Sequence, residues 1–123
     1  MTKGEVLQTF FSGFGMKAYA ASAVPDKAVF PRLTYDLILD NWEGGEVSLT
    51  VNMWFRTDGE AEPNAKAQAL SDAIGSGGKR LPCDGGYIWL KRGSPWCQSL
   101  RDDNDPTIKR RYINVTAEYL TKN

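Results

Sequence analysis

The chain has 123 residues, a length that favours one domain, and its 41% hydrophobic and 24% charged residues are ordinary for a soluble globular protein. Its 15 basic residues balance 15 acidic residues, which argues against sequence-specific nucleic-acid binding because phosphate contacts need a basic surface. The lack of histidine excludes Ser-His-Asp and Cys-His catalysis within this chain, so we expect a protein that is not an enzyme.

The first half of the chain predicts a helix, a loop, a strand, a turn and a longer strand, at residues 3–15, 18–31, 33–40, 41–45 and 46–56. The helix is indicated by an apolar stripe at helical spacing and by Thr2 followed by Glu5, a capping-box pattern. The longer strand has the clearest pattern, because apolar and polar residues alternate along it. Its predicted buried face consists of Val47, Leu49, Val51, Met53 and Phe55.

The second half predicts a helix and three strands, at residues 64–74, 87–92, 96–101 and 109–120. The predicted buried face of the helix consists of Ala69, Leu70, Ala73 and Ile74. In the first of these strands, side chains alternate between two faces. One face carries Tyr87, Trp89 and Lys91, and the other carries Ile88, Leu90 and Arg92.

The predicted fold is α+β: a single mostly antiparallel sheet packed against two helices, in the order α-β-β-α-β-β-β, as a single domain over residues 1–123. Both faces of the strand at 87–92 carry large apolar groups, so we expect helices to cover one face and another chain the other. The sequence has no apolar run that could span a membrane and no evident export signal. Cys83 and Cys97 are therefore expected to be free, buried thiols in a reducing cytoplasm.

Two short motifs have a chemical and a simpler structural interpretation. The segment 75–80 is similar to a phosphate loop, but Ala73 and Arg80 stand where that loop needs Gly and Ser or Thr. We interpret it as a helix stop. The acidic run 102–106 could offer oxygen ligands to a metal, yet it lacks the Gly and Glu of a calcium loop, and its composition favours a turn. We expect no cofactor or metal, and a metal enzyme built on this run is the least favoured alternative.

Basic residues and tryptophans are the candidates for contact with a partner. The basic clusters 91–92 and 109–111 form either a solvated face, paired with acidic residues, or a contact for an acidic partner. The expected acidic residues are Asp102, Asp103 and Asp105. Trp54 is either a packed edge or a binding hot spot. The candidate interface residues are Trp42, Trp54, Tyr87, Trp89, Lys91, Arg92 and Trp96.

Several segments, taken in their order and spacing, resemble the tail-terminator (tail-completion) proteins of long-tailed phages and prophages. The resemblance covers most of the chain, from about Leu7 to Leu120. It is carried by residues 14–19, 24–26, 30–35, 51–56, 84–93 and 110–115. One departure is Arg32, at a position where these proteins often have an aromatic residue.

The resemblance implies a ring, typically a hexamer, that caps the head-proximal end of the tail tube, ends its polymerisation and joins it to the head connector. The implied partners are the chain itself, the tail tube protein and connector proteins, in a virion assembled in the bacterial cytoplasm. A ring needs two different complementary patches, for which we expect the Trp42 turn and a hairpin from Tyr87 to Trp96. The alternatives are a head-closure or adaptor protein, or a small ligand-binding domain with a pocket lined by Tyr87 and Trp89.

Overall fold

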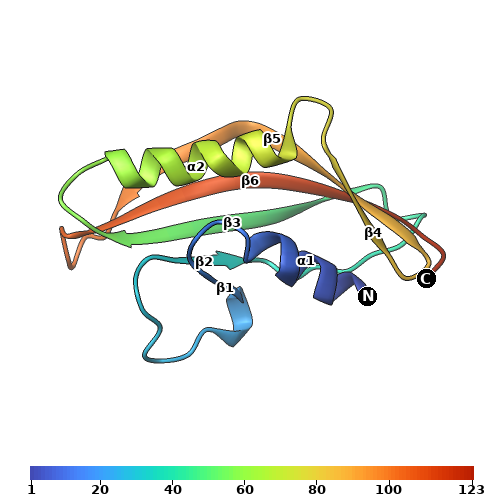
Figure 1. The fold of residues 1–123 in the computed structure, drawn as a ribbon, viewed down its shortest axis with the longest axis horizontal. Coiled ribbons are helices and arrows are strands. Elements are labelled where there is room, and N and C mark those ends of the chain that lie inside the picture. Colours follow the sequence, from blue (N-terminus) through green and yellow to red (C-terminus); the bar gives the residue numbers. More distant parts are fainter.

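The computed structural model describes all 123 residues as one curled sheet of six strands with two helices on the same face (Figure 1). In chain order, the elements are α1 (Lys3–Phe11), β1 (Lys17–Ala20), the 3₁₀ helix η1 (Ala21–Ala23), β2 (Arg32–Tyr35), β3 (Glu46–Arg56), α2 (Ala61–Ile74), β4 (Lys79–Cys83), β5 (Gly86–Arg101) and β6 (Ile108–Thr121). The strands lie in the order β1-β2-β3-β6-β5-β4. Only β1 and β2 are parallel.

The α+β class, the single mostly antiparallel sheet and the two helices are confirmed, but the predicted order is wrong in detail. Strand β1 overlaps the start of the predicted loop 18–31, and β4 follows α2 where no strand was expected. The predicted strands at 87–92 and 96–101 are one continuous strand, β5. A bulge between Arg92 and Cys97 lets this strand continue its pairing with β6.

Helix α1 begins as predicted and ends earlier. The Thr2 hydroxyl accepts a hydrogen bond from the Glu5 amide, and the Glu5 carboxylate accepts one from the Thr2 amide, which confirms the capping box. The helix ends at Phe11, not at residue 15. Gly15 has a φ of +74°, a left-handed conformation that favours glycine and cannot continue an α-helix.

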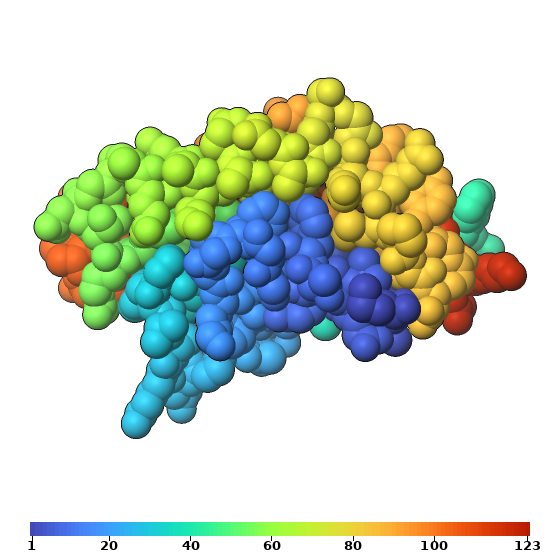
Figure 2. All heavy atoms as spheres, in the orientation of Figure 1, coloured from blue at the N-terminus to red at the C-terminus, as the bar shows by residue number.

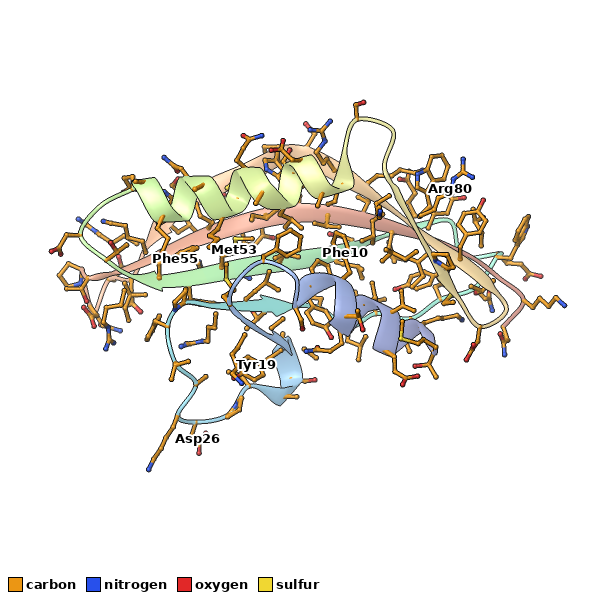
Figure 3. The ribbon with its side chains drawn as sticks, viewed as in Figure 1. Phe10, Tyr19, Asp26, Met53, Phe55 and Arg80 are labelled. Atoms are coloured by element: carbon orange, nitrogen blue, oxygen red, sulfur yellow. The ribbon has the colours of Figure 1, made fainter.

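Strand β3 occupies the predicted residues, and its apolar side faces the helices. Leu49, Val51, Met53 and Phe55 are fully buried, whereas the residues between them are not. Figure 3 shows Met53 and Phe55 of β3 and Phe10 of α1 in the layer between the helices and the sheet. The core therefore lies on one face of the sheet.

Helix α2 begins at Ala61, three residues earlier than predicted, because proline is tolerated in the first turn of a helix, where Pro63 lies. Its buried residues are Pro63, Ala67, Leu70, Ser71 and Ile74. The prediction was right for Leu70 and Ile74 and wrong for Ala69 and Ala73, which are exposed. The buried stripe runs along Ala67, Leu70 and Ile74, at helical spacings of three and four.

Candidate interaction surfaces

The sheet has one covered face and one open face. Side chains of α1 and α2 close over the sheet in the space-filling view (Figure 2). No helix lies on the opposite face, which we call the open face, although large side chains of β2, β3, β5 and β6 line it. These include Arg32, Trp54, Arg56, Tyr87, Trp89, Lys91, Arg110 and Tyr112. An uncovered sheet face with aromatic side chains is a candidate for contact with another chain.

The seven predicted interface residues lie in four places. The open face carries Trp54, Tyr87, Trp89 and Lys91. Arg92 points to the helix side, where its Nη1 donates to Ser71 Oγ of α2 at 2.9 Å. Trp96 is half-buried against the core at the β5 bulge. Trp42 is 67% exposed in the connection between β2 and β3.

The hairpin expected from Tyr87 to Trp96 does not form, because these residues belong to one strand. Gly93 lies against Asn114 of β6 so closely that a side chain at this position would meet the Asn114 backbone oxygen at 2.8 Å. The Asn114 side-chain amide donates to Pro95 O at 2.6 Å. These contacts hold the apparent turn Gly93–Pro95 on the sheet, where it is the bulge of β5.

At one end of the open face, the positive charge of Lys91 is already paired with carboxylates of the same chain. Lys91 Nζ lies 3.1 Å from a Glu118 oxygen and 3.4 Å from a Glu46 oxygen, and 3.8 Å from the centre of the Trp89 ring. Burial alone lowers the pKa of Lys91, but the two carboxylates outweigh this and raise it above its usual value. Trp89 Nε1 donates to Gly77 O at 3.0 Å. The polar groups at this end therefore have partners already.

The other end of the open face carries alternating arginines and aromatic rings. We call Phe30, Arg32, Trp54, Arg56 and Arg110 the basic-aromatic cluster. The Arg32 guanidinium lies between two rings, 4.4 Å from that of Phe30 and 5.6 Å from that of Trp54. Arg110 covers the Trp54 ring at 5.1 Å, and Arg56 covers the Phe30 ring at 4.7 Å. Strand pairing creates this arrangement, because Trp54 of β3 lies opposite Arg32 of β2 and Arg110 of β6.

The charges of the basic-aromatic cluster are only partly compensated. Arg56 forms an ion pair with Asp105 at 3.6 Å. Arg32 donates to the Ala28 carbonyl at 3.3 Å, and neither Arg32 nor Arg110 forms an ion pair. A cavity of about 210 Å³ lies beside Trp54 and Arg110. This end of the open face therefore offers positive charge and aromatic surface to a partner.

A second exposed surface lies in the connection between β2 and β3. We call residues 36–43 the acidic loop. It contains four of the six large hydrophobic side chains that are exposed in the whole molecule: Leu37, Ile38, Leu39 and Trp42. Its three carboxylates form no ion pair: Asp36, Asp40 and Glu43. The sequence predicted a strand over most of this segment, but β2 ends at Tyr35.

The backbone of the acidic loop is tied to the rest of the fold by hydrogen bonds, including one from the Asp36 amide to Thr50 O at 3.0 Å and one from Lys3 Nζ to Asp40 O at 2.7 Å. The buried Tyr119 hydroxyl of β6 donates to the Ile38 carbonyl, and the Trp42 amide donates to Thr121 O at 3.1 Å. Burial, with a contribution from the negative charge of Asp40, raises the pKa of Tyr119 to about 12. The loop backbone is thus fixed, while its apolar side chains remain in solvent.

The predicted pairing of the basic clusters with Asp102, Asp103 and Asp105 is largely wrong. Lys109 and Arg111 both pair with Glu60, at the start of α2, and the Arg111 side chain is almost fully buried. The acidic run forms the predicted turn: Asp102 accepts from the Asn104 amide at 2.8 Å, and Asp105 accepts from the Thr107 amide at 3.0 Å. The carboxylates of Asp102 and Asp105 thus accept local hydrogen bonds, and of the three only Asp105 pairs with a basic residue, Arg56.

The two cysteines are free, as predicted, and half-buried. Burial raises the pKa of both the Cys83 thiol and the Cys97 thiol. Both therefore stay protonated near neutral pH, which makes them poor nucleophiles. They belong to the packing of the sheet rather than to a reactive site.

No helix of the structure is long and apolar enough to cross a membrane. Tyr87 and Trp89 line none of the four surface cavities, which gives the ligand-pocket alternative no support. The chain matches no protein-family model and no curated protein. The open face and the acidic loop are therefore the observations on which a function must be argued.

Sequence reasoning selected Trp54, Trp42 and the basic cluster 109–111, but it did not predict that Arg32, Arg56 and Arg110 gather around Trp54 and Phe30. The alternation in β3 predicts Trp54 and Arg56 on one face, and the structure confirms it. Arg32 and Arg110 come from other strands and meet Trp54 only through the register of the sheet. The apolar residues of the acidic loop were missed because a run of three aliphatic residues is typical of a buried strand.

Proposed function

We propose that the protein is a structural component of a long-tailed phage or prophage, a tail terminator that acts without catalysis. In this proposal, copies of the chain form a ring, a hexamer, on the head-proximal end of the tail tube. The ring ends tube polymerisation and joins the tail to the head connector within the virion. The proposal is supported by the ordered resemblance of segments along most of the chain and by the surfaces described above.

One observation carries the proposal: two surfaces of different chemistry, each suited to contact with another chain, lie toward opposite ends of one sheet. The acidic loop exposes aliphatic and aromatic side chains, and the open face exposes a basic-aromatic cluster. A ring is built from head-to-tail contacts, in which one patch of each copy meets a different patch of the next copy. Exposed apolar groups of this extent are typical of surfaces that become covered on assembly.

The proposal is tested by disrupting the gene in the phage or prophage that encodes the chain and imaging the particles by negative-stain electron microscopy. We expect tails of uncontrolled length that do not join heads, because nothing ends tube growth. Expression of the chain from a plasmid should restore tails of one length. Normal virions without the protein would refute the proposal.

The same images separate the tail terminator from the alternative of a head-closure or adaptor protein. A missing head-side component leaves tails of normal length that are not attached to heads, since termination of the tube does not depend on it. Tail length is therefore the deciding readout, and attachment alone is not. Labelling the protein with gold should then place it at the head-proximal end of free tails.

A further inference from the structure

We propose that the acidic loop of one copy docks on the basic-aromatic cluster of the next copy, so that assembly runs head to tail through this pair of surfaces. The biological setting of this contact rests on the proposed function, whereas the contact itself is argued from charge, exposure and position in the fold. The sequence predicted the stretch from Tyr87 to Trp96 as the second contact patch of the ring. In this proposal, the second patch is instead the Trp54 end of the open face.

The two surfaces have complementary chemistry. The acidic loop offers three carboxylates without an ion pair, set among exposed aliphatic side chains and Trp42. The basic-aromatic cluster offers the guanidiniums of Arg32 and Arg110, which also lack carboxylate partners, around the Trp54 ring. Val29, which is 60% exposed, adds apolar surface next to Phe30. Arginine pairs with carboxylates through a planar fork while its flat face stays on an aromatic ring, so both contacts can form together.

The Trp42 end of the acidic loop cannot reach the basic-aromatic cluster within one molecule. The loop starts beside Thr50, whose carbonyl accepts from the Asp36 amide, and runs to the Glu46 end of β3, whereas Trp54 and Arg56 lie near the other end. At about 3.3 Å per residue, the ten steps from Glu46 to Arg56 span about 33 Å. Figure 1 shows the connection before β3 at one end of the sheet and the β5–β6 turn at the other. A contact between them is therefore heterologous, and it closes into a ring when the rotation between copies permits.

The Lys91 end of the open face is a weaker candidate for the same role. Its one lysine is already paired with Glu46 and Glu118, so an incoming carboxylate would meet negative charge as well as positive. The basic-aromatic cluster has one internal pair, between Arg56 and Asp105, and two guanidiniums without one. Charge complementarity thus selects the Trp54 end.

The test measures self-association of the full-length chain by sedimentation equilibrium. Arg110→Glu reverses one charge of the cluster, and Trp42→Ala combined with Glu43→Lys alters the acidic loop. Each variant is expected to weaken self-association on the order of tenfold or more. Lys66→Glu makes the same change in charge on α2, on the helix side, and should associate like the wild type. Circular dichroism and thermal melts check that every variant is folded.

A mixture of the two defective variants gives the decisive result. The Arg110→Glu variant keeps an intact acidic loop, and the loop variant keeps an intact cluster, so one contact can form between them. That contact leaves no working surface for a third copy. We expect a 1:1 heterodimer of about 27 kDa, twice the 13.7 kDa of one chain, at a concentration at which each variant alone is monomeric.

Three results would overturn the inference. One is a wild-type chain that stays monomeric up to about 1 mM, where even a weak contact of about −4 kcal/mol would be seen. Another is unchanged self-association of Arg110→Glu, or failure of the two variants to form a heterodimer. The third is loss of single-stranded oligonucleotide binding in Arg110→Glu with self-association intact, which would assign the cluster to nucleic acid. Head-to-tail assembly together with normal virions after gene disruption would instead refute the proposed function alone.

Discussion

The hydroxyl of Tyr119 fastens the acidic loop to the core, and its removal tests this attachment. The side chain is fully buried, and the hydroxyl donates to the Ile38 carbonyl. Tyr119→Phe removes one neutral hydrogen bond while keeping the ring, so we expect a loss of about 1 kcal/mol in unfolding free energy at pH 7. Amides of residues 36–43 should also exchange with deuterium faster than in the wild type.

The pH dependence of this difference is a sharper test. The folded-state pKa of Tyr119 is raised to about 12, above the ordinary value of 10.0, so the unfolded chain loses this proton first as the pH rises. The stabilisation of the wild type is therefore complete below pH 10 and is lost between pH 10 and pH 12. This loss comes to about 3 kcal/mol at 1.36 kcal/mol for each pH unit. Because phenylalanine does not titrate, Tyr119→Phe should become the more stable protein above about pH 11.

The assay is urea denaturation of both proteins between pH 7 and pH 11.5, followed by circular dichroism. Tyr112→Phe is the matched control, since this tyrosine lies on the open face and its hydroxyl forms no hydrogen bond within the chain. It should stay close to the wild type throughout. Curves for the wild type and Tyr119→Phe that remain parallel over the whole range would refute the reasoning.

Three further predictions concern the helices. Leu70→Ala should lower the unfolding free energy, measured by urea denaturation, by about 2–5 kcal/mol because it opens a cavity in the core. Ala73→Ser should change this free energy little, and similar losses in the two variants would contradict the observed buried face of α2. The hydrogen bond from the Arg111 guanidinium holds the pKa of Glu60 below its usual value of 4.5 in the folded chain. The stability that this pairing contributes is therefore present above pH 4.5 and is lost as the pH falls through the pKa of Glu60 in the folded chain. Glu60→Gln should lower thermal stability at pH 7 and lack this part of the acid sensitivity, and a wild-type-like acid titration would count against the pairing. Thr2→Ala should cost about 1 kcal/mol by removing the cap of α1, measured by thermal melting, and no change would show that the cap is dispensable.

The elements with strong local patterns could be predicted from the sequence. Strand β3 alternates so regularly that its bounds and buried face were right, and the capping box located the start of α1. Strand β1 has no such pattern, because its four residues depend on pairing with β2. Strand β4 contains Pro82, which argues locally against a strand but is tolerated at the edge that β4 forms.

The candidate site was only partly accessible to sequence reasoning, because it is assembled by register. Arg32, Trp54 and Arg110 come from three strands, and no local spacing relates them. The stretch from Gly93 to Pro95 was predicted to be a turn from its composition, yet contacts with Asn114 keep it in the sheet as a bulge. Local composition sets the preference of a segment, and pairing with distant strands decides the outcome.

Strand β6 lies between β3 and β5 and comes last among the strands in chain order. Before β6 is made, β3 can pair only with β2 and β5 only with β4, and the edge of each that faces β6 stays unpaired. The sheet therefore cannot close until residues 108–121 have left the ribosome. Pairings between distant segments are slow to form, and unpaired strands in an incomplete chain are prone to aggregation. Arg110 also belongs to this strand, so a growing chain does not carry the complete basic-aromatic cluster. In the proposed head-to-tail contact, a neighbouring copy can therefore bind this surface only on a subunit whose fold is finished.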